Sequence, residues 1–90
     1  MYAVLVAVTI ESGKEDEALE HLRSQVVPGV KQAPGAIHGY WLAPSGGQGY
    51  STVVFESEEQ AKAAAEMVPQ RVPEFVTISH VQVQEIIADF

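Results

Sequence analysis

The sequence predicts an α+β fold in which two helices cover one face of a four-stranded antiparallel sheet. Four runs are rich in β-branched and aromatic residues, as strands are. Two runs between them carry apolar residues at helical spacing and begin at a Ser. The runs alternate in the order strand, helix, strand, strand, helix, strand. The expected strands span residues 2–10, 35–44, 50–55 and 75–84.

Length and composition indicate one domain over residues 1–90. A chain this short buries only about 60–65% of its extended surface on folding, so its stability is marginal. Small domains commonly gain further burial by self-association. Apolar residues make up 47% of the chain and charged residues 19%, which excludes a disordered protein. There is no Cys, so a disulfide framework and thiolate chemistry are excluded.

The net charge of −7 argues against phosphate-rich partners. An acidic surface repels nucleic-acid backbones and anionic lipid, so we expect neither a nucleic-acid nor a membrane role. Residues 1–10 are apolar but too short for a membrane helix, and they lack the basic leader of a signal peptide. We expect a cytoplasmic protein.

The first strand is apolar on both faces. Residues 4, 6, 8 and 10 form one apolar set, and Ala3, Leu5 and Ala7 form the other. A strand of this kind lies in the centre of a sheet and is covered on both sides. Two helices cover only one side, so a second copy of the chain is expected to cover the other.

Both helices are expected to begin at capping boxes and to end at prolines. Ser12 and Glu15 have capping-box spacing, and so do Ser57 and Gln60. Pro28 followed by Gly is expected to end the first helix, and Pro69 the second. The second helix buries a stripe of Ala residues, which allows close packing on a sheet. His21, on the flank of the first helix, is expected to be solvent-exposed.

The middle strands form a hairpin that contains the only Trp of the chain. Residues 45–49 are rich in Gly and are typical of a hairpin turn. Because strand side chains alternate, His38 and Tyr40 share one face and Trp41 lies on the other. Which of these faces meets the helices is left open by the sequence.

Alternation in the last strand separates Val81 and Val83 from Ile78, His80 and Gln82. The tail that follows, residues 85–90, is expected to pack across a neighbouring subunit.

The element order β-α-β-β-α-β is the ferredoxin-like pattern. Right-handed crossovers place both helices on one side of the sheet, and the other side would be a bare apolar surface. Soluble monomers avoid such a surface. The sequence therefore predicts a homodimer that packs sheet against sheet, with larger assemblies left open.

Four segments resemble the dimeric α+β barrel superfamily, and within it the antibiotic-biosynthesis monooxygenase type of domain. They are Ser12–Glu15, Gly39–Leu42, Gly49–Phe55 and Glu56–Ala61. The resemblance implies a ferredoxin-like homodimer with a pocket between sheet and helices. It also implies an activity such as the oxidation of aromatic polyketides or quinols without metal or flavin, or haem degradation. The chain contains no Asn, a residue that haem-degrading members use in the pocket, so we expect no haem chemistry.

The candidate catalytic residues are His38, Tyr40 and His80. A His can deprotonate a phenolic substrate near neutral pH, and a Tyr beside it can hydrogen-bond to that substrate. The alternative is that all three are packing residues of a core or an interface. Ser79 precedes His80 but points to the opposite face, so the two form no nucleophile–base pair.

The candidate substrate-binding residues are Trp41, Tyr50 and Arg71. The two aromatic rings would contact a flat ligand, and Arg71 would bind an anionic or enolate oxygen at the pocket mouth. The alternatives are a packing role for the rings and a solvated loop Arg.

No metal site or cofactor is expected. The three His residues are widely spaced, and there is no Cys to complete a ligand set. The Gly cluster at residues 46–49 joins two strands and opens no helix, so it lacks the amide array that binds phosphate. The leading hypothesis is a cofactor-independent monooxygenase of an aromatic or quinol-type molecule. The competing hypothesis is a non-catalytic module that binds a small hydrophobic ligand or serves in assembly.

Overall fold

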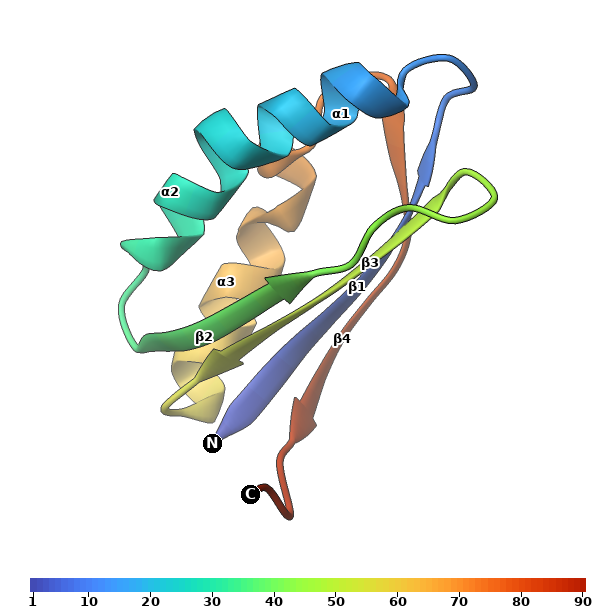
Figure 1. Ribbon diagram of the computed structural model, residues 1–90. Coiled ribbons are helices and arrows are strands. Elements are labelled where there is room, and N and C mark those ends of the chain that lie inside the picture. Colours follow the sequence, from blue (N-terminus) through green and yellow to red (C-terminus); the bar gives the residue numbers. More distant parts are fainter.

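The computed structural model describes all residues from Met1 to Phe90 and confirms the predicted fold (Figure 1). One four-stranded antiparallel sheet carries every helix on the same face. The strands are β1 (Tyr2–Ile10), β2 (Ala36–Trp41), β3 (Gln48–Phe55) and β4 (Val76–Glu85). The helical segments are α1 (Glu15–His21), the π-helical turn η1 (Leu22–Val26), α2 (Val27–Lys31) and α3 (Glu58–Arg71). None of the helices combines the length and apolar character needed to cross a bilayer.

The sheet order β2-β3-β1-β4 places β1 in the centre, as its doubly apolar sequence predicts. Val4 lies opposite Val53 of β3 and Val83 of β4. Directly opposed residues share a face of the sheet. The even-numbered residues of β1 therefore lie on the face that the helices cover. Leu5 lies on the opposite face, which no helix covers.

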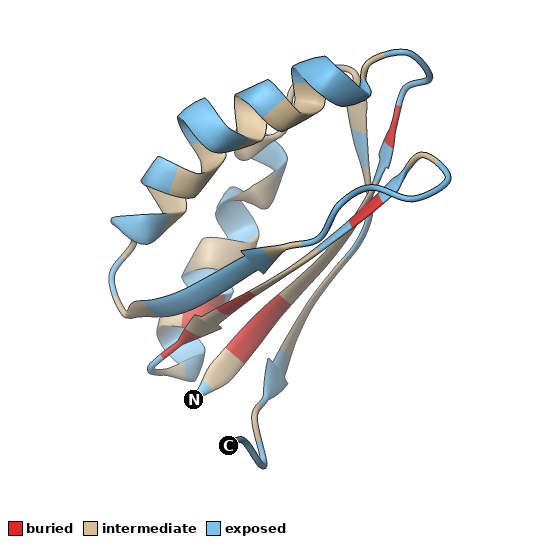
Figure 2. Cartoon of the chain, in the orientation of Figure 1, coloured by how far each residue is buried: buried red, intermediate tan, exposed pale blue.

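The core lies at one end of the sheet, under the start of α3 (Figure 2). It consists of Val4, Val53, Phe55 and Ala61, and Phe55 is the largest fully buried side chain, at 1% exposure. Ala61 is fully buried, and its small side chain lets α3 lie close to the strands. Burial elsewhere between sheet and helices is incomplete, which leaves room for a cavity.

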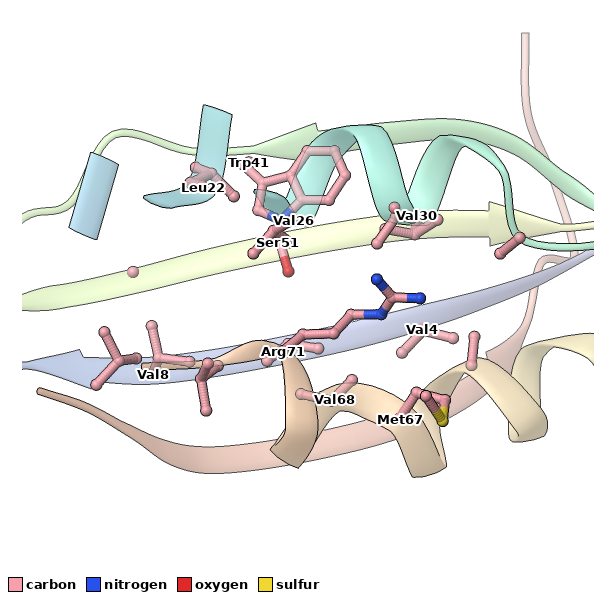
Figure 3. A pocket seen from close by; sticks show the side chains of 18 of the residues that line it. Val4, Val8, Leu22, Val26, Val30, Trp41, Ser51, Met67, Val68 and Arg71 are labelled. Atoms are coloured by element: carbon pink, nitrogen blue, oxygen red, sulfur yellow. The ribbon is translucent and has the colours of Figure 1, made fainter. Parts of the chain in front are cut away.

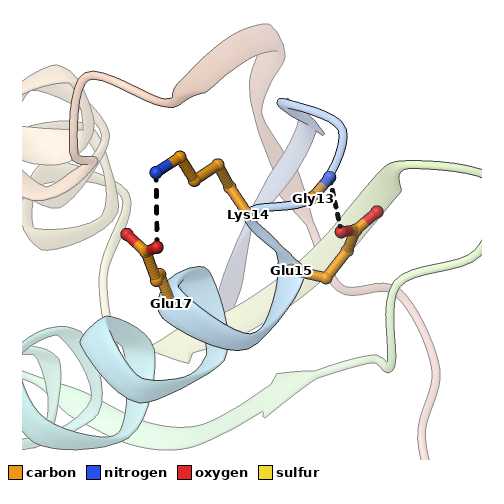
Figure 4. Close-up of polar contacts among 4 residues, drawn as sticks. All are labelled: Gly13, Lys14, Glu15 and Glu17. Atoms are coloured by element: carbon orange, nitrogen blue, oxygen red, sulfur yellow. Dashed lines mark hydrogen bonds and ion pairs between the residues drawn. The ribbon is translucent and has the colours of Figure 1, made fainter.

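The first helix begins without the predicted Ser12 cap. Lys14 is the residue before α1, and no side chain caps the helix. Instead, the Glu15 carboxylate accepts a hydrogen bond of 3.1 Å from the Gly13 N–H, and Lys14 pairs with Glu17 at 3.3 Å (Figure 4). The prediction was wrong because no side chain accepts from the amides of the first turn of α1, where the Ser12 hydroxyl was expected to cap the Glu15 N–H.

The second helix begins as predicted. The Ser57 hydroxyl accepts a hydrogen bond of 3.2 Å from the Gln60 N–H. The Gln60 side chain does not complete a capping box, because its Oε1 is buried without a hydrogen-bond partner. Only half of the reciprocal pattern is therefore formed.

Neither proline ends its helix, so both predicted ends are wrong. Pro28 lies in the first turn of α2, directly after η1. A proline has no backbone N–H to donate, and its ring clashes with the carbonyl group four residues before it in an α-helix. The π turn accommodates Pro28 because its hydrogen bonds span five residues instead of four. Pro69 lies in the last turn of α3, and the helix continues past it to Arg71. The first helical region is consequently longer than predicted and reaches Lys31.

A bulge in β4 corrects the predicted faces of that strand. The register shifts between Ala7 and Val8, so that His80 opposes Ala7 while Ile78 opposes Val8. Ile78 therefore shares a face with Val8, on the helix side, rather than with His80. An extra residue in a bulge reverses the alternation beyond it.

The hairpin between β2 and β3 has the predicted glycine turn. Gly46 and Gly47 have φ values of 60° and 77°, and Ser45 and Gln48 exchange two backbone hydrogen bonds. Two consecutive positive φ values define the type I′ turn, which matches the twist of paired strands.

Gly35 is a position where we expect even Ala to be poorly tolerated. Its φ is +80°, and an added methyl group would overlap the side-chain amide of Gln60. We expect Gly35→Ala to lower the free energy of unfolding by roughly 1–3 kcal/mol, measured by urea denaturation. Gly13→Ala is the matched control, because Gly13 has a φ of +84° but open space around it. Equal losses in the two variants would show that the Gln60 contact adds nothing.

Candidate functional site

A cavity of about 760 Å³ lies between the sheet and the helices. Its floor is formed by alternate residues of the two central strands, among them Val6, Val8 and Ser51. Its roof comes from the first helical region and its far wall from α3. Most of the lining side chains are apolar, so the cavity suits an apolar guest.

The roof is a stripe of apolar residues with a spacing of four. Leu22, Val26 and Val30 lie one helical turn apart along η1 and α2, and all three line the cavity (Figure 3). Side chains at this spacing share one face of a helix. The stripe reaches Val30 only because the helix continues past Pro28.

Trp41 is the one large aromatic side chain on the cavity side of β2. Its ring lies over Gly39, where an added Cβ would be 2.7 Å from Cζ3 of the indole. The missing side chain at Gly39 thus lets the indole lie across the strand. This places a flat apolar surface at the wall of the cavity.

Arg71 brings a positive charge into this apolar space. It is the last residue of α3, and its side chain extends through the cavity toward α2 (Figure 3). The ion pairs of the chain are Lys14–Glu17 and Lys62–Glu58, and neither involves Arg71. The sequence placed Arg71 in a loop after Pro69; the structure places it on the helix and partly buried.

His21 also lines the cavity, which the sequence interpretation missed. It is partly buried, and its Nε2 lies 3.0 Å from the backbone carbonyl oxygen of Arg71. A carbonyl oxygen only accepts, so Nε2 carries the proton and Nδ1 of the neutral ring is free to accept one. The available signal was helical spacing, because His21 lies three residues after Ala18, which also lines the cavity.

The three candidate catalytic residues lie on the other face of the sheet. The rings of His38 and Tyr40 stack with centroids 6.5 Å apart, and Tyr40 is 61% exposed. His80 is exposed, and its Nε2 lies 2.7 Å from Oε1 of Gln82. None of the three lines the cavity.

Tyr50 borders the cavity, but its side chain belongs to the uncovered face. It opposes Ala7, and its hydroxyl donates a hydrogen bond of 2.9 Å to Oε1 of Gln48. Of the three candidate binding residues, the structure therefore brings together Trp41 and Arg71.

The uncovered face is largely apolar along its centre. Leu5 lies in the middle of β1, opposite Thr52 and Gln82. Register and alternation place a further set of apolar residues on this face: Ala3, Ala7, Tyr40, Tyr50 and Val54. We call this surface the open face.

The one clear shift in acidity lies outside the cavity. The Glu85 carboxylate is the main reason that the pKa of Tyr2 is raised above its usual value, with burial and Glu58 adding to it. A raised pKa keeps the phenol protonated at neutral pH, so Tyr2 is no general base. No three acidic or His side chains come together as a metal site would need.

No known protein family and no curated protein matches the chain by sequence. Solved structures do match its fold along its whole length. A dimeric ferredoxin-like protein from an uncultured marine organism has a TM-score of 0.73 and 14% identity, covering 100% of this chain and 98% of that one. A protein from Chloroflexus aurantiacus described as an antibiotic biosynthesis monooxygenase has a TM-score of 0.69 and 14% identity, with coverage of 99% and 95%.

The chain has the ferredoxin-like α+β fold of these structures. A third structure, a MhuD variant with two manganese protoporphyrin IX molecules bound per active site, has a TM-score of 0.67 and 19% identity. It covers 100% of this chain and 98% of MhuD. Likeness at such low identity establishes the fold, and function has to be argued from the site.

Proposed function

We propose that the chain binds a small, largely apolar aromatic molecule in the cavity beneath its helices. The observation that carries the proposal is an apolar cavity of about 760 Å³ with Trp41 at its wall. Ligand sites range over about 300–1,000 Å³ and are lined mainly by apolar and aromatic side chains. The porphyrin bound by the MhuD variant supports a flat ligand in this fold.

We also propose that two copies pack open face to open face. Apart from Ala3, which is buried at 7% exposure, the apolar residues of the open face are partly or largely exposed in one chain, and a second copy would cover them. The dimeric state of the marine ferredoxin-like protein supports a dimer. In such a dimer, His38, Tyr40 and His80 lie between the two sheets.

The second candidate function is oxidation of the bound molecule by O₂ without metal or flavin. The observation that favours it is His21, the one His that lines the cavity. Nδ1 of His21 would remove a proton from an activated CH₂ group of the substrate. The carbanion would add O₂, and the resulting hydroperoxide would lose water to leave a carbonyl. One CH₂ and one O₂ give one C=O and one H₂O, so no external reductant is needed.

Oxygen uptake with a panel of anthrone-like substrates separates the two functions. We expect turnover in the wild type and a roughly 10²- to 10⁴-fold lower kcat in His21→Gln, the range for loss of a general base. His38→Gln is the matched control, because His38 lies outside the cavity, and its kcat should be unchanged. Binding of anthrone without any oxygen uptake, followed by Trp41 fluorescence, would identify a non-catalytic binding module.

A further inference from the structure

The positive charges of the cavity contrast with the acidity of the whole chain. The net charge is −7, with twelve acidic residues against five basic ones. Both arginines, Arg23 and Arg71, nevertheless line the cavity, whereas Glu59 is the one acidic residue that does so. Arg23 is exposed and also borders Asp16 and Glu20, so Arg71 is the partly buried cation of the cavity.

Glu59 does not neutralise Arg71. The two residues lie at opposite ends of α3, twelve positions apart. At 1.5 Å of rise per residue, this separation is about 18 Å along the helix axis. No hydrogen bond or ion pair of the chain involves the guanidinium of Arg71.

The guanidinium of Arg71 lies against the backbone of α2. Nη1 of Arg71 lies so close to Gly29 that an added Cβ there would overlap it. The φ of Gly29 is not positive, so its backbone conformation does not require glycine. A side chain at position 29 would instead be excluded by the nearby guanidinium of Arg71. The end of α3 and the middle of α2 therefore hold the charge between them, inside the cavity.

We propose that the aromatic ligand carries a carboxylate group and that Arg71 binds it, with Gly29 as a positioning residue. This inference rests on the aromatic-binding function proposed above. A partly buried charge without a partner is unfavourable, and a ligand carboxylate would supply that partner. The planar fork of a guanidinium matches the two oxygens of a carboxylate in a bidentate pair.

A purely structural role for Arg71 makes a different prediction. A cation in the last turn of a helix stabilises the helix dipole, and Arg71 occupies that position in α3. Such a role would affect the melting temperature but not the choice between charged and neutral ligands. The test therefore measures a ratio of affinities.

The experiment is a calorimetric titration of the full chain at pH 7 with 2-naphthoate and with its neutral analogue 2-naphthamide. We expect the wild type to bind 2-naphthoate at least ten-fold more tightly. Arg71→Gln should reduce this ratio to about one and leave the affinity for 2-naphthamide unchanged. Arg71→Lys should retain part of the preference, because it keeps the charge and loses the fork.

Gly29→Ala gives a second route to the same answer. Ala favours a helix over Gly, so this variant is expected to fold at least as well as the wild type. Its added methyl group displaces the guanidinium, so 2-naphthoate affinity should fall several-fold while 2-naphthamide affinity stays the same.

Equal wild-type affinity for the two ligands would overturn the carboxylate inference and leave the aromatic-binding proposal standing. A preference that survives in both Arg71→Gln and Gly29→Ala would also overturn it, by assigning the charge recognition to other residues. Failure of both ligands to bind would contradict the proposed function, and the inference with it.

Discussion

Leu5→Asp is expected to convert the proposed dimer into a 9.7 kDa monomer. Leu5 lies in the middle of the central strand, on the open face, where a second sheet would cover it. Burying an unpaired carboxylate between two apolar sheets costs several kcal/mol. We therefore expect the dimer dissociation constant to rise by at least a hundred-fold, measured by analytical ultracentrifugation at micromolar concentration. In the monomer the new carboxylate faces water, so the fold itself should persist.

Gln25→Asp is the control for charge alone. It makes the same change in net charge, but Gln25 is exposed on η1, on the helix side of the sheet. This variant should remain dimeric. A wild-type chain that sediments as a monomer, or a Leu5→Asp chain that stays dimeric, would show that the open face is not the interface.

Phe55→Ala should remove much of the stability of the chain. Phe55 is 1% exposed and packs with Val4, Val53 and Ala61. Deleting a buried Phe side chain costs about 3–5 kcal/mol, against about 5–15 kcal/mol for the whole unfolding reaction of a small protein. We expect a correspondingly lower midpoint in urea, followed by circular dichroism at one fixed protein concentration, because dimerisation adds to the measured stability.

Phe90→Ala is the matched control. It deletes the same side chain from the exposed end of the chain, where no packing is lost. Its midpoint should stay within experimental error of the wild type. A comparable loss in both variants would mean that the tail contributes as much to stability as the core.

Strand patterns were the most readable part of the sequence. The run of apolar residues predicted the bounds of β1 and its central position in the sheet. A strand that is covered on both faces has apolar side chains at consecutive positions, which is easy to recognise in a sequence. The paired glycines predicted the turn between β2 and β3. The bulge in β4, which moves Ile78 to the helix side of the sheet, has no recognisable sequence pattern, because it depends on how β4 pairs with β1.

Helix ends were less readable, because they depend on the surroundings of single residues. Pro28 was expected to stop a helix, and the π turn before it removed the conflict. Ser12 has the spacing of a cap, yet no side chain caps α1, and the Glu15 carboxylate bonds the Gly13 N–H.

The site was predictable only in part. Alternation correctly separated Trp41 from His38 and Tyr40. The central strand is apolar on both faces, so its sequence could not say which face the helices cover. The chemistry of Arg71 predicts anion binding at the mouth of a pocket, but the sequence pattern places this residue in a loop after Pro69, whereas the structure has it on α3. His21 was overlooked because a single His at the edge of an apolar helical stripe resembles a surface residue.

The cavity and the open face are built from the same strands. Along β1, Val4, Val6 and Val8 line the cavity, while Leu5 and Ala7 alternate with them on the other side. Under the two proposals, substitutions at positions 6 and 8 would alter the ligand site, and substitutions at positions 5 and 7 would alter the dimer contact. One strand would then allow the two surfaces to evolve separately.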